Sequence, residues 1–382
     1  MSYKLPTGSE ASILEDNASG AVLGQKDRLI AKAISEIGTR LPADQRALTH
    51  SFVHQYYAGV APEDLVGREP ADLVGAALCH LELARKRRGG GRKLRIYNPD
   101  PNTHGWRSQH TIVEIVSPDM PFLVDSAGAE INRRGFTLHL VIHPILALKR
   151  DPQGRLIEIF EADAAGDGAL ESLMHFEIDC ETDPALLRAL TNDLNRVLDD
   201  VRVAVEDWKK MSDRVLESIQ ELQSVPLDPG EIAQSVAFLA WLLDGNFTFL
   251  GYREQALVTE GGEESLRIVQ SSGLGILRER EPRCLARNFA ELPPQLRRLA
   301  RERSALILTK SSSKSTVHRS AYLDYVGIKR FDPKGRVLGE RRFLGLYTSA
   351  AYHSNPRQIP VIGRKIERVM QRSDLAPKSH AG

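Results

Sequence analysis

The chain has few cysteines and no stretch that is apolar enough to cross a membrane. Its three cysteines, Cys79, Cys180 and Cys284, lie far apart and form no CxxC pair, which argues against a disulfide framework or a zinc knuckle. The N-terminal segment MSYKLPTGSEASILEDN is polar and lacks the apolar core of a signal peptide. These absences predict a cytoplasmic protein without a membrane partner.

The sequence also lacks a phosphate-binding loop. Gly273 and Gly275 begin a GxG, but the third glycine of GxGxxG is missing and no βαβ unit follows. The formal net charge is +1 with acids and bases mixed, so no overall field points to nucleic acid. The basic run 85–93 has no interleaved aromatics and closes a predicted helix, whose dipole favours cations. We therefore predict no cofactor and no nucleic acid on this chain.

Two histidine pairs are candidate metal ligands. His139 and His143 fall on a predicted strand, where four residues span about 13 Å, too far for one zinc ion. His50 and His54 share a helical face but lack the glutamate of an HExxH motif. The sequence therefore predicts no metal site, and no residue is assigned a catalytic role.

The composition and element pattern predict an α+β fold in three parts. Helical spacing over 21–39, about 44–57 and 71–88, closed by the glycines 89–91, predicts a helical N-terminal region over residues 1–91. The motif VPLDPGE, residues 225–231, predicts the second boundary, so the parts are 1–91, 92–224 and 225–382.

The middle part has the order β-α-β-β-α of a ferredoxin-like split βαβ unit. Its predicted elements are the strand 111–117, the helix 121–135, the strands 136–150 and 172–180, and a helix from Pro184. Residues 94–99 are expected to pair with 111–117 as an added edge strand. Residues 201–205 alternate like a strand but also keep helical spacing, and one long helix from Pro184 to about Leu222 is preferred.

The last part begins with an apolar helix, followed by two strands, a helical segment at 288–303 and three more strands. The final two strands are expected to turn at Asp332–Gly335. This order favours a PAS-like antiparallel-sheet domain. The closing helix presents Ile362, Ile366 and Met370 on one face, from which we expect an apolar surface that a further domain buries.

The residues Ser117–Leu123, sequence SPDMPFL, resemble the strand–helix joint of ACT domains, modules by which metabolic enzymes sense amino acids. A helix N-terminus can take a carboxylate, although Asp119 could serve only as a cap. In ligand-binding ACT domains the joint usually reads Asp-x-Pro-Gly, and here Phe122 replaces the glycine. The candidate residues are Ser117, Asp119, Pro121 and Phe122, and occlusion by Phe122 and effector binding both stay open.

A second candidate is the hydroxyl-rich stretch TKSSSKSTVHR, residues 309–319. It contains the cations Lys310, Lys314, His318 and Arg319, which together with the hydroxyls could contact an anion. The alternative is a flexible polar loop that follows a strand.

Three blocks are similar to the N-terminal part of the long-chain NAD-specific glutamate dehydrogenases of bacteria. They are KSSSKSTVHRSAYLDYVGIKRFDPKGRVLGERRFLGLYTSAAYHSNPRQIPVIGRKIERVMQRS, FLAWLLDGNFTFLGYRE, and SPDMPFLVDSAGAEINRRG with LHLVIHPIL. The resemblance implies a regulatory and oligomerisation segment, with the NAD site and the catalytic lysine in the remainder of the dehydrogenase chain. It implies a homo-oligomer and an amino-acid effector. A free-standing amino-acid sensor is the alternative.

Overall fold

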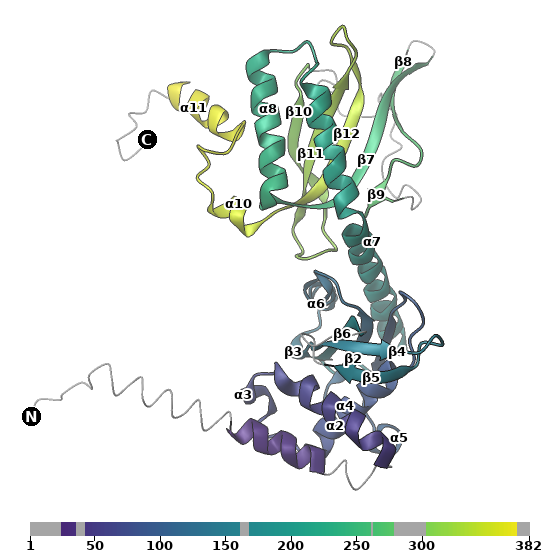
Figure 1. Ribbon diagram of the computed structural model, residues 1–382. Coiled ribbons are helices and arrows are strands. Elements are labelled where there is room, and N and C mark those ends of the chain that lie inside the picture. Colours follow the sequence, from purple (N-terminus) through teal and green to yellow (C-terminus); the bar gives the residue numbers. More distant parts are fainter. Residues whose placement is uncertain (1–23, 36–42, 161–167, 261–262, 279–302, 373–382) are drawn as a thin grey trace, which may run out of the picture. The chain divides into compact units, whose positions relative to one another are not determined.

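The computed structural model describes residues 24–35, 43–160, 168–260, 263–278 and 303–372 (Figure 1). The contacts divide the chain into two compact units, 1–196 and 197–382, which are described separately. Helix α7 (Pro184–Leu222) begins in the first unit and continues into the second. Among the described residues, no helix combines the length and the apolar character that a bilayer crossing requires.

The first unit combines helices with one antiparallel sheet. Residues 24–35 are helical. The helices that follow are α2 (Ala43–Ala58), α3 (Pro62–Leu65), α4 (Pro70–Ala84), α5 (Pro101–His104) and α6 (Leu123–Arg133). The strands are β1 (Lys93–Tyr97), β2 (Thr111–Pro118), β3 (Leu138–Ile142), β4 (Ile145–Arg150), β5 (Leu156–Phe160) and β6 (Ala169–Ile178).

The β-α-β-β-α order predicted for this unit is present, with two differences. Strands β2 and β4 lie on either side of β6 and run antiparallel to it, in the order β1-β2-β6-β4-β5. Strand β1 pairs with β2 as the predicted edge. The stretch predicted as one strand, 136–150, is divided into β3 and β4 at His143-Pro144, where proline offers no backbone donor. Strand β5 was not predicted.

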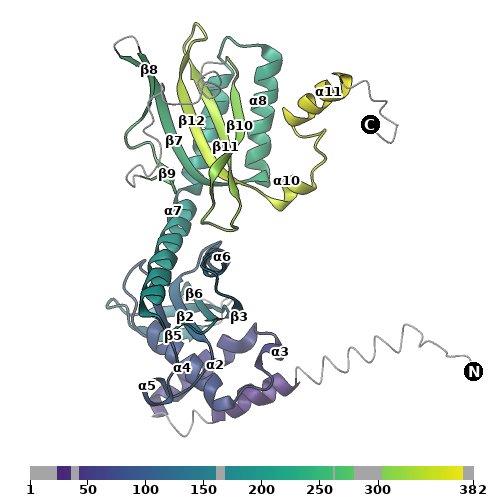
Figure 2. The ribbon, with the colours of Figure 1, turned by 180° about the vertical axis from the view of Figure 1, so that it is seen from behind.

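The sheet of the first unit is covered on both faces. Helices α2 and α4 lie on one face and α6 on the opposite face (Figures 1 and 2). Phe52, Tyr57 and Leu81 from the helices pack with Val116 and Leu173 from the sheet in one buried cluster. This double cover explains why β2 is buried along nearly its whole length.

The helical N-terminal residues thus share a compact unit with the first sheet. The predicted boundaries at residues 91/92 and 224/225 separate domains, whereas the two compact units are defined by contacts within the fold. The three-part division therefore stays a prediction. Helix α7 runs through residues 201–205, so the long-helix interpretation is confirmed there.

The second unit is built on another antiparallel sheet. Its strands are β7 (Phe247–Glu260), β8 (Glu263–Ile268), β9 (Leu274–Gly275), β10 (Leu306–Lys314), β11 (Tyr322–Phe331) and β12 (Val337–Tyr347). Besides α7, its helices are α8 (Pro229–Trp241), the π-helical turn η2 (Leu242–Asn246), α10 (Ser349–His353) and α11 (Ile362–Arg372).

The strands of this second sheet follow the order β10-β11-β12-β7-β8, with β9 paired to β7. The C-terminal half of α7 and helix α8 contribute Met211, Val215 and Phe238 to a core that also contains Val326 and Phe343 of the sheet. The predicted turn is confirmed, because the Gly335 N–H donates to the Asp332 carbonyl at 2.9 Å. The helical segment expected over 288–303 falls largely outside the described residues.

Candidate functional site

The joint between β2 and α6 holds the four residues that the sequence nominated. Phe122 is the N-cap of α6 and has a φ of 74°, in the left-handed region that favours glycine. Its side chain is half-buried. The backbone here therefore has a conformation that favours glycine, although a phenylalanine occupies the position. Asp119 donates its N–H to the Leu170 carbonyl, which ties the joint to β6.

Polar side chains gather beside this joint. Ser117 and Ser172 lie opposite each other in the β2–β6 register. The Ser117 hydroxyl is buried without a hydrogen-bond partner, and His143 Nε2 lies 2.5 Å from the Ser172 hydroxyl. Burial lowers the pKa of His143, and the nearby Asp119 raises it in part. The joint thus combines a helix N-terminus with one free buried hydroxyl.

The second candidate, residues 309–319, is organised differently from the predicted loop. Lys310 and Lys314 belong to strand β10, so only the residues after Lys314 leave the sheet. Lys310 pairs with Asp324 at 2.6 Å, and the Lys314 ammonium lies 5.6 Å from the centre of the Tyr322 ring. Arg319 donates to the Tyr347 carbonyl at 2.9 Å. His318 has a φ of 69°, in the left-handed region. The anion-contacting role of these four residues stays a prediction.

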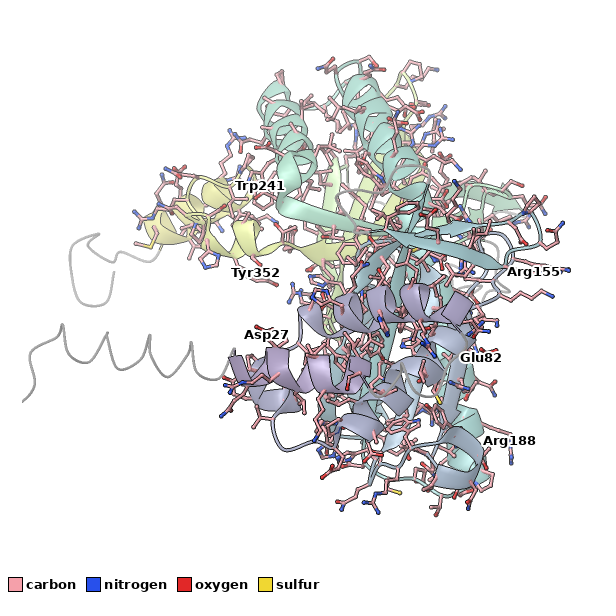
Figure 3. The ribbon with its side chains drawn as sticks, turned by 60° about the horizontal axis from the view of Figure 1, so that its bottom comes forward. Asp27, Glu82, Arg155, Arg188, Trp241 and Tyr352 are labelled. Carbon is pink, nitrogen blue, oxygen red and sulfur yellow. The ribbon has the colours of Figure 1, made fainter. Side chains whose placement is uncertain are left out.

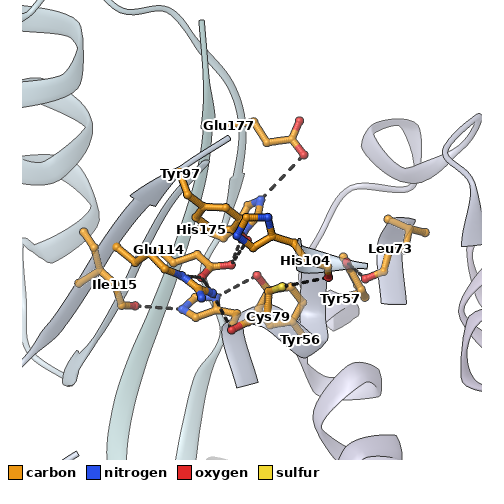
Figure 4. A network of polar contacts seen from close by, with 12 residues as sticks. Tyr56, Tyr57, Leu73, Cys79, Tyr97, His104, Glu114, Ile115, His175 and Glu177 are labelled. Atoms are coloured by element: carbon orange, nitrogen blue, oxygen red, sulfur yellow. Dashed lines mark hydrogen bonds and ion pairs between the residues drawn. The ribbon is translucent and has the colours of Figure 1, made fainter. Parts of the chain in front are cut away.

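Among the described residues, a further cluster of ionisable side chains lies between α4 and the first sheet (Figure 4). His80 of α4, Glu114 of β2 and His175 of β6 are buried with no exposed area. Their nearest ligand atoms all lie within 4.8 Å of one another. Arg95 holds Glu114 at 2.5 Å, and Arg68 holds the neighbouring Glu177 at 2.6 Å.

Burial and mutual contact shift the titration of this cluster. Burial lowers the pKa of His80 to about 4. Burial would raise the pKa of Glu114, but His175, His80 and Arg95 outweigh it and bring the value to about 2. For His175 burial acts to lower the pKa, and the carboxylates of Glu114 and Glu177 raise it above the ordinary value. The carboxylates are therefore charged at neutral pH.

Sequence reasoning missed this cluster because its members are far apart in the chain. Glu114, His175 and Glu177 lie within strands that are mostly apolar, and alternation alone does not show whether their face of the sheet is covered. The helices α2 and α4 cover that side. The usable signal was the presence of ionisable residues in the middle of two central strands. The pairs that the sequence did consider are apart from it: His139 bonds Asp179 at 2.7 Å, and His54 is exposed.

Comparison with known proteins connects this fold to one family. A family model described as "Glutamate dehydrogenase, ACT1 domain" matches residues 52–194, and one described as "Glutamate dehydrogenase, helical motif 1" matches residues 359–382. NAD-specific glutamate dehydrogenase of Halomonas elongata is 38% identical over 93% of this chain and 22% of its own length. The enzyme of Pseudomonas aeruginosa is 38% identical over 87% of the chain and 21% of its own length.

A more distant relative agrees with these two. NAD-specific glutamate dehydrogenase of Mycobacterium tuberculosis is 27% identical over 82% of this chain and 18% of its own length. The chain thus spans about a fifth of the length of the curated relatives it matches. It is similar to an N-terminal part of the large NAD-specific glutamate dehydrogenases.

Proposed function

We propose that this segment regulates and assembles an NAD-specific glutamate dehydrogenase as a homo-oligomer. The remaining chain would convert L-glutamate, NAD+ and water to 2-oxoglutarate, ammonium and NADH. The observation that carries the proposal is the match over 93% of the chain to such an enzyme, with residues 52–194 in its ACT1 domain. In this proposal the segment has no catalytic residue of its own, and NAD binds to the remainder.

The joint between β2 and α6 is the regulatory element of this proposal. Its helix N-terminus and left-handed backbone support descent from an effector site, whereas Phe122 supports closure of that site. We place Phe122 over the space that an amino acid would occupy. The joint then transmits assembly contacts and does not sense an effector.

The second unit, in this proposal, is a PAS-like domain. Its element order of helix, two strands and three further strands supports this, as does the central position of the first strand, β7, beside the last, β12. Helices α7 and α8 on one face complete the arrangement. We assign it a structural connection to the remainder of the enzyme.

The first test separates regulation from catalysis. The 382-residue chain alone is titrated with NAD in a calorimeter, and no saturable binding in the micromolar range is expected. In the full enzyme, the variant Phe122→Gly is expected to change the response of NADH formation to amino acids without abolishing the reaction. Saturable NAD binding by the isolated chain would contradict the absence of a cofactor site.

The second test examines the closed joint. Phe122→Gly removes a strained left-handed phenylalanine, worth about 1 kcal/mol, and loses a ring that is only half-buried, so stability is expected to change by less than about 1 kcal/mol. Phe122→Ala is the control, because it removes the ring but keeps the strain. Both variants are expected to gain a thermal shift with an amino acid, because both remove the ring that closes the space. A wild-type shift that Ser117→Ala abolishes would overturn closure.

A further inference from the structure

The buried cluster of His80, Glu114 and His175 has the composition and spacing of a metal centre. Two imidazoles and one carboxylate form a ligand set that zinc accepts in proteins. The three side chains come from helix α4 and strands β2 and β6, so an ion held by them would join the helical layer to the sheet. Nothing in the family comparisons assigns a role to these residues.

His80 is oriented as a ligand by its second ring nitrogen. Its Nε2 lies 3.2 Å from the Ile115 carbonyl oxygen, which can only accept, so Nε2 carries the proton. Nδ1 is therefore the atom with the free lone pair, and it lies 3.0 Å from the Tyr56 hydroxyl. A ring fixed by donation to a backbone carbonyl is the usual support of a metal-binding histidine.

His175 provides the strongest observation, because it has a fully buried ring with no hydrogen bond at either nitrogen. Nδ1 lies 3.9 Å from Glu114 Oε1, and Nε2 lies 3.8 Å from Glu177 Oε1. A charged imidazolium would form N–H···O bonds of about 2.8 Å with such carboxylates. Two ligands bound to one zinc ion at about 2.0 Å lie about 3.3 Å apart. The three ligand atoms lie within 4.8 Å of one another, so binding an ion would draw a pair of them together by up to about 1.5 Å.

The carboxylates are held in the orientations that such a centre needs. Arg95 contacts Glu114 Oε2 through two nitrogens, at 2.5 and 3.2 Å. Oε1 accepts a hydrogen bond from the Tyr97 hydroxyl at 3.0 Å, and its second lone pair is the one available for an ion beside His175 Nδ1. Arg68 grips both oxygens of Glu177 at 2.6 and 3.0 Å, which fixes that carboxylate behind His175 Nε2. Figure 4 shows Glu114, His175 and Tyr56 converging while Glu177 lies farther out. Glu177 thus corresponds to the outer carboxylate of a carboxylate–histidine–metal arrangement.

We infer that this first unit binds a structural zinc ion through His80 Nδ1, His175 Nδ1 and Glu114 Oε1, with the Tyr56 hydroxyl oxygen as the fourth ligand. The two arginines balance the charges of Glu114 and Glu177, and loss of the Tyr56 proton on binding supplies a negative charge to the ion. All four ligands come from protein and the site is buried, as in closed structural zinc sites. The ion fastens α2 and α4 to the sheet and takes part in no reaction.

The test begins with metal content. The 382-residue chain is expressed with zinc in the medium, passed briefly through a chelator and analysed by elemental mass spectrometry. We expect about one zinc ion per chain. Replacement by cobalt is expected to give the strong visible absorption of a tetrahedral Co(II) centre. If the chain contains no zinc after zinc loading while circular dichroism shows that it is folded, the inference is overturned. His175 would then be an imidazolium between two glutamates.

Variants locate the ion. His175→Gln and Glu114→Gln are expected to lower the zinc affinity at least tenfold, whereas His139→Gln, on an exposed histidine of the same sheet, is expected to retain zinc. If the first two variants fail to fold, anomalous diffraction from wild-type crystals at the zinc edge decides. A peak within bonding distance of His80, Glu114 and His175 supports the site, and a peak elsewhere overturns it.

Discussion

Glu171 in the first sheet and Glu340 in the second are both buried, but they differ in their partners. Arg87 and Arg150 each contact both oxygens of Glu171, at distances between 2.6 and 2.9 Å. Glu340 accepts a hydrogen bond from the Tyr325 hydroxyl. The nearby Arg342 donates to Tyr325 at 3.2 Å and to Gln255 at 3.0 Å.

The titration of the two glutamates follows these partners. Burial acts to raise the pKa of both carboxyls. For Glu171 the guanidinium groups of Arg150 and Arg87 outweigh burial and bring the pKa below its ordinary value. For Glu340 burial prevails over Arg342 and raises the pKa to about 7. Two guanidinium forks on one carboxylate therefore compensate desolvation, whereas a phenol and a more distant arginine do not.

The largest effect is expected from breaking the arginine pairing. Glu171→Ala leaves Arg87 and Arg150 buried without their carboxylate and is expected to lower the free energy of unfolding by about 3–5 kcal/mol. Glu82→Ala is the control, because Glu82 is exposed and pairs with Arg85 on the helix surface (Figure 3). That control is expected to cost less than about 0.5 kcal/mol. Urea unfolding measures both, and equal losses would contradict the role of pairing.

A pH series separates the two glutamates. The raised folded pKa of Glu340 gives a stability contribution that is complete below its unfolded pKa near 4.5 and is lost as pH rises through about 7. The loss approaches about 3 kcal/mol. The charged groups facing Glu340 are Arg342 and, opposite it in the strand register, Lys329.

Glu340→Gln keeps an acceptor for Tyr325 but cannot ionise. We expect this variant to be more stable than wild type at pH 8 and no more stable at pH 4.5, as measured by chemical unfolding at each pH. A difference between the two proteins that does not change with pH would show that Glu340 titrates normally.

Local sequence patterns predicted much of the secondary structure that carries these buried carboxyl groups. They did not predict which side chains the carboxyl groups contact. The hydrophobic spacing through residues 184–222 gave the long helix, and Asp332–Gly335 gave the turn of the second sheet. Such features depend on residues that are neighbours in sequence. The division of 136–150 at Pro144 was readable from the same local chemistry and was overlooked.

The polar interactions could not be read in this way. Arg87 follows α4 and reaches Glu171 of β6 with its side chain, and His80 of α4 reaches His175 of the same strand. Both contacts exist only because the fold brings distant parts of the chain together. Alternation in a strand indicates which residues share a face, but it does not reveal that a helical layer from another part of the sequence covers that face. The chemistry of the joint was more accessible, because Ser117 to Phe122 are contiguous.

Asp207 shows whether the partner or the unit determines how a buried carboxyl behaves. Asp207 lies on α7 and belongs to the second unit, which also contains Glu340. Like Glu171, however, it is paired with a guanidinium group. Arg278 contacts both of its oxygens, at 2.5 and 2.8 Å, and the Gly275 N–H donates at 2.9 Å. Burial acts to raise the pKa of Asp207, but these donors bring it to about 2.

The resulting stability should depend on pH in the direction opposite to that of Glu340. A lowered folded pKa gives a contribution that is present above the unfolded value near 3.8 and is lost as pH falls through about 2. Asp207→Asn is expected to lower the free energy of unfolding at pH 7 by about 2 kcal/mol and to cost progressively less in acid. Asp199→Asn is the control, because that exposed pair with Arg202 is worth less than about 0.5 kcal/mol. Glu340→Gln should become more stabilising relative to wild type as pH rises. If Asp207→Asn did the same, the pKa of a buried carboxyl in the second unit would depend on the unit and not on its guanidinium partner.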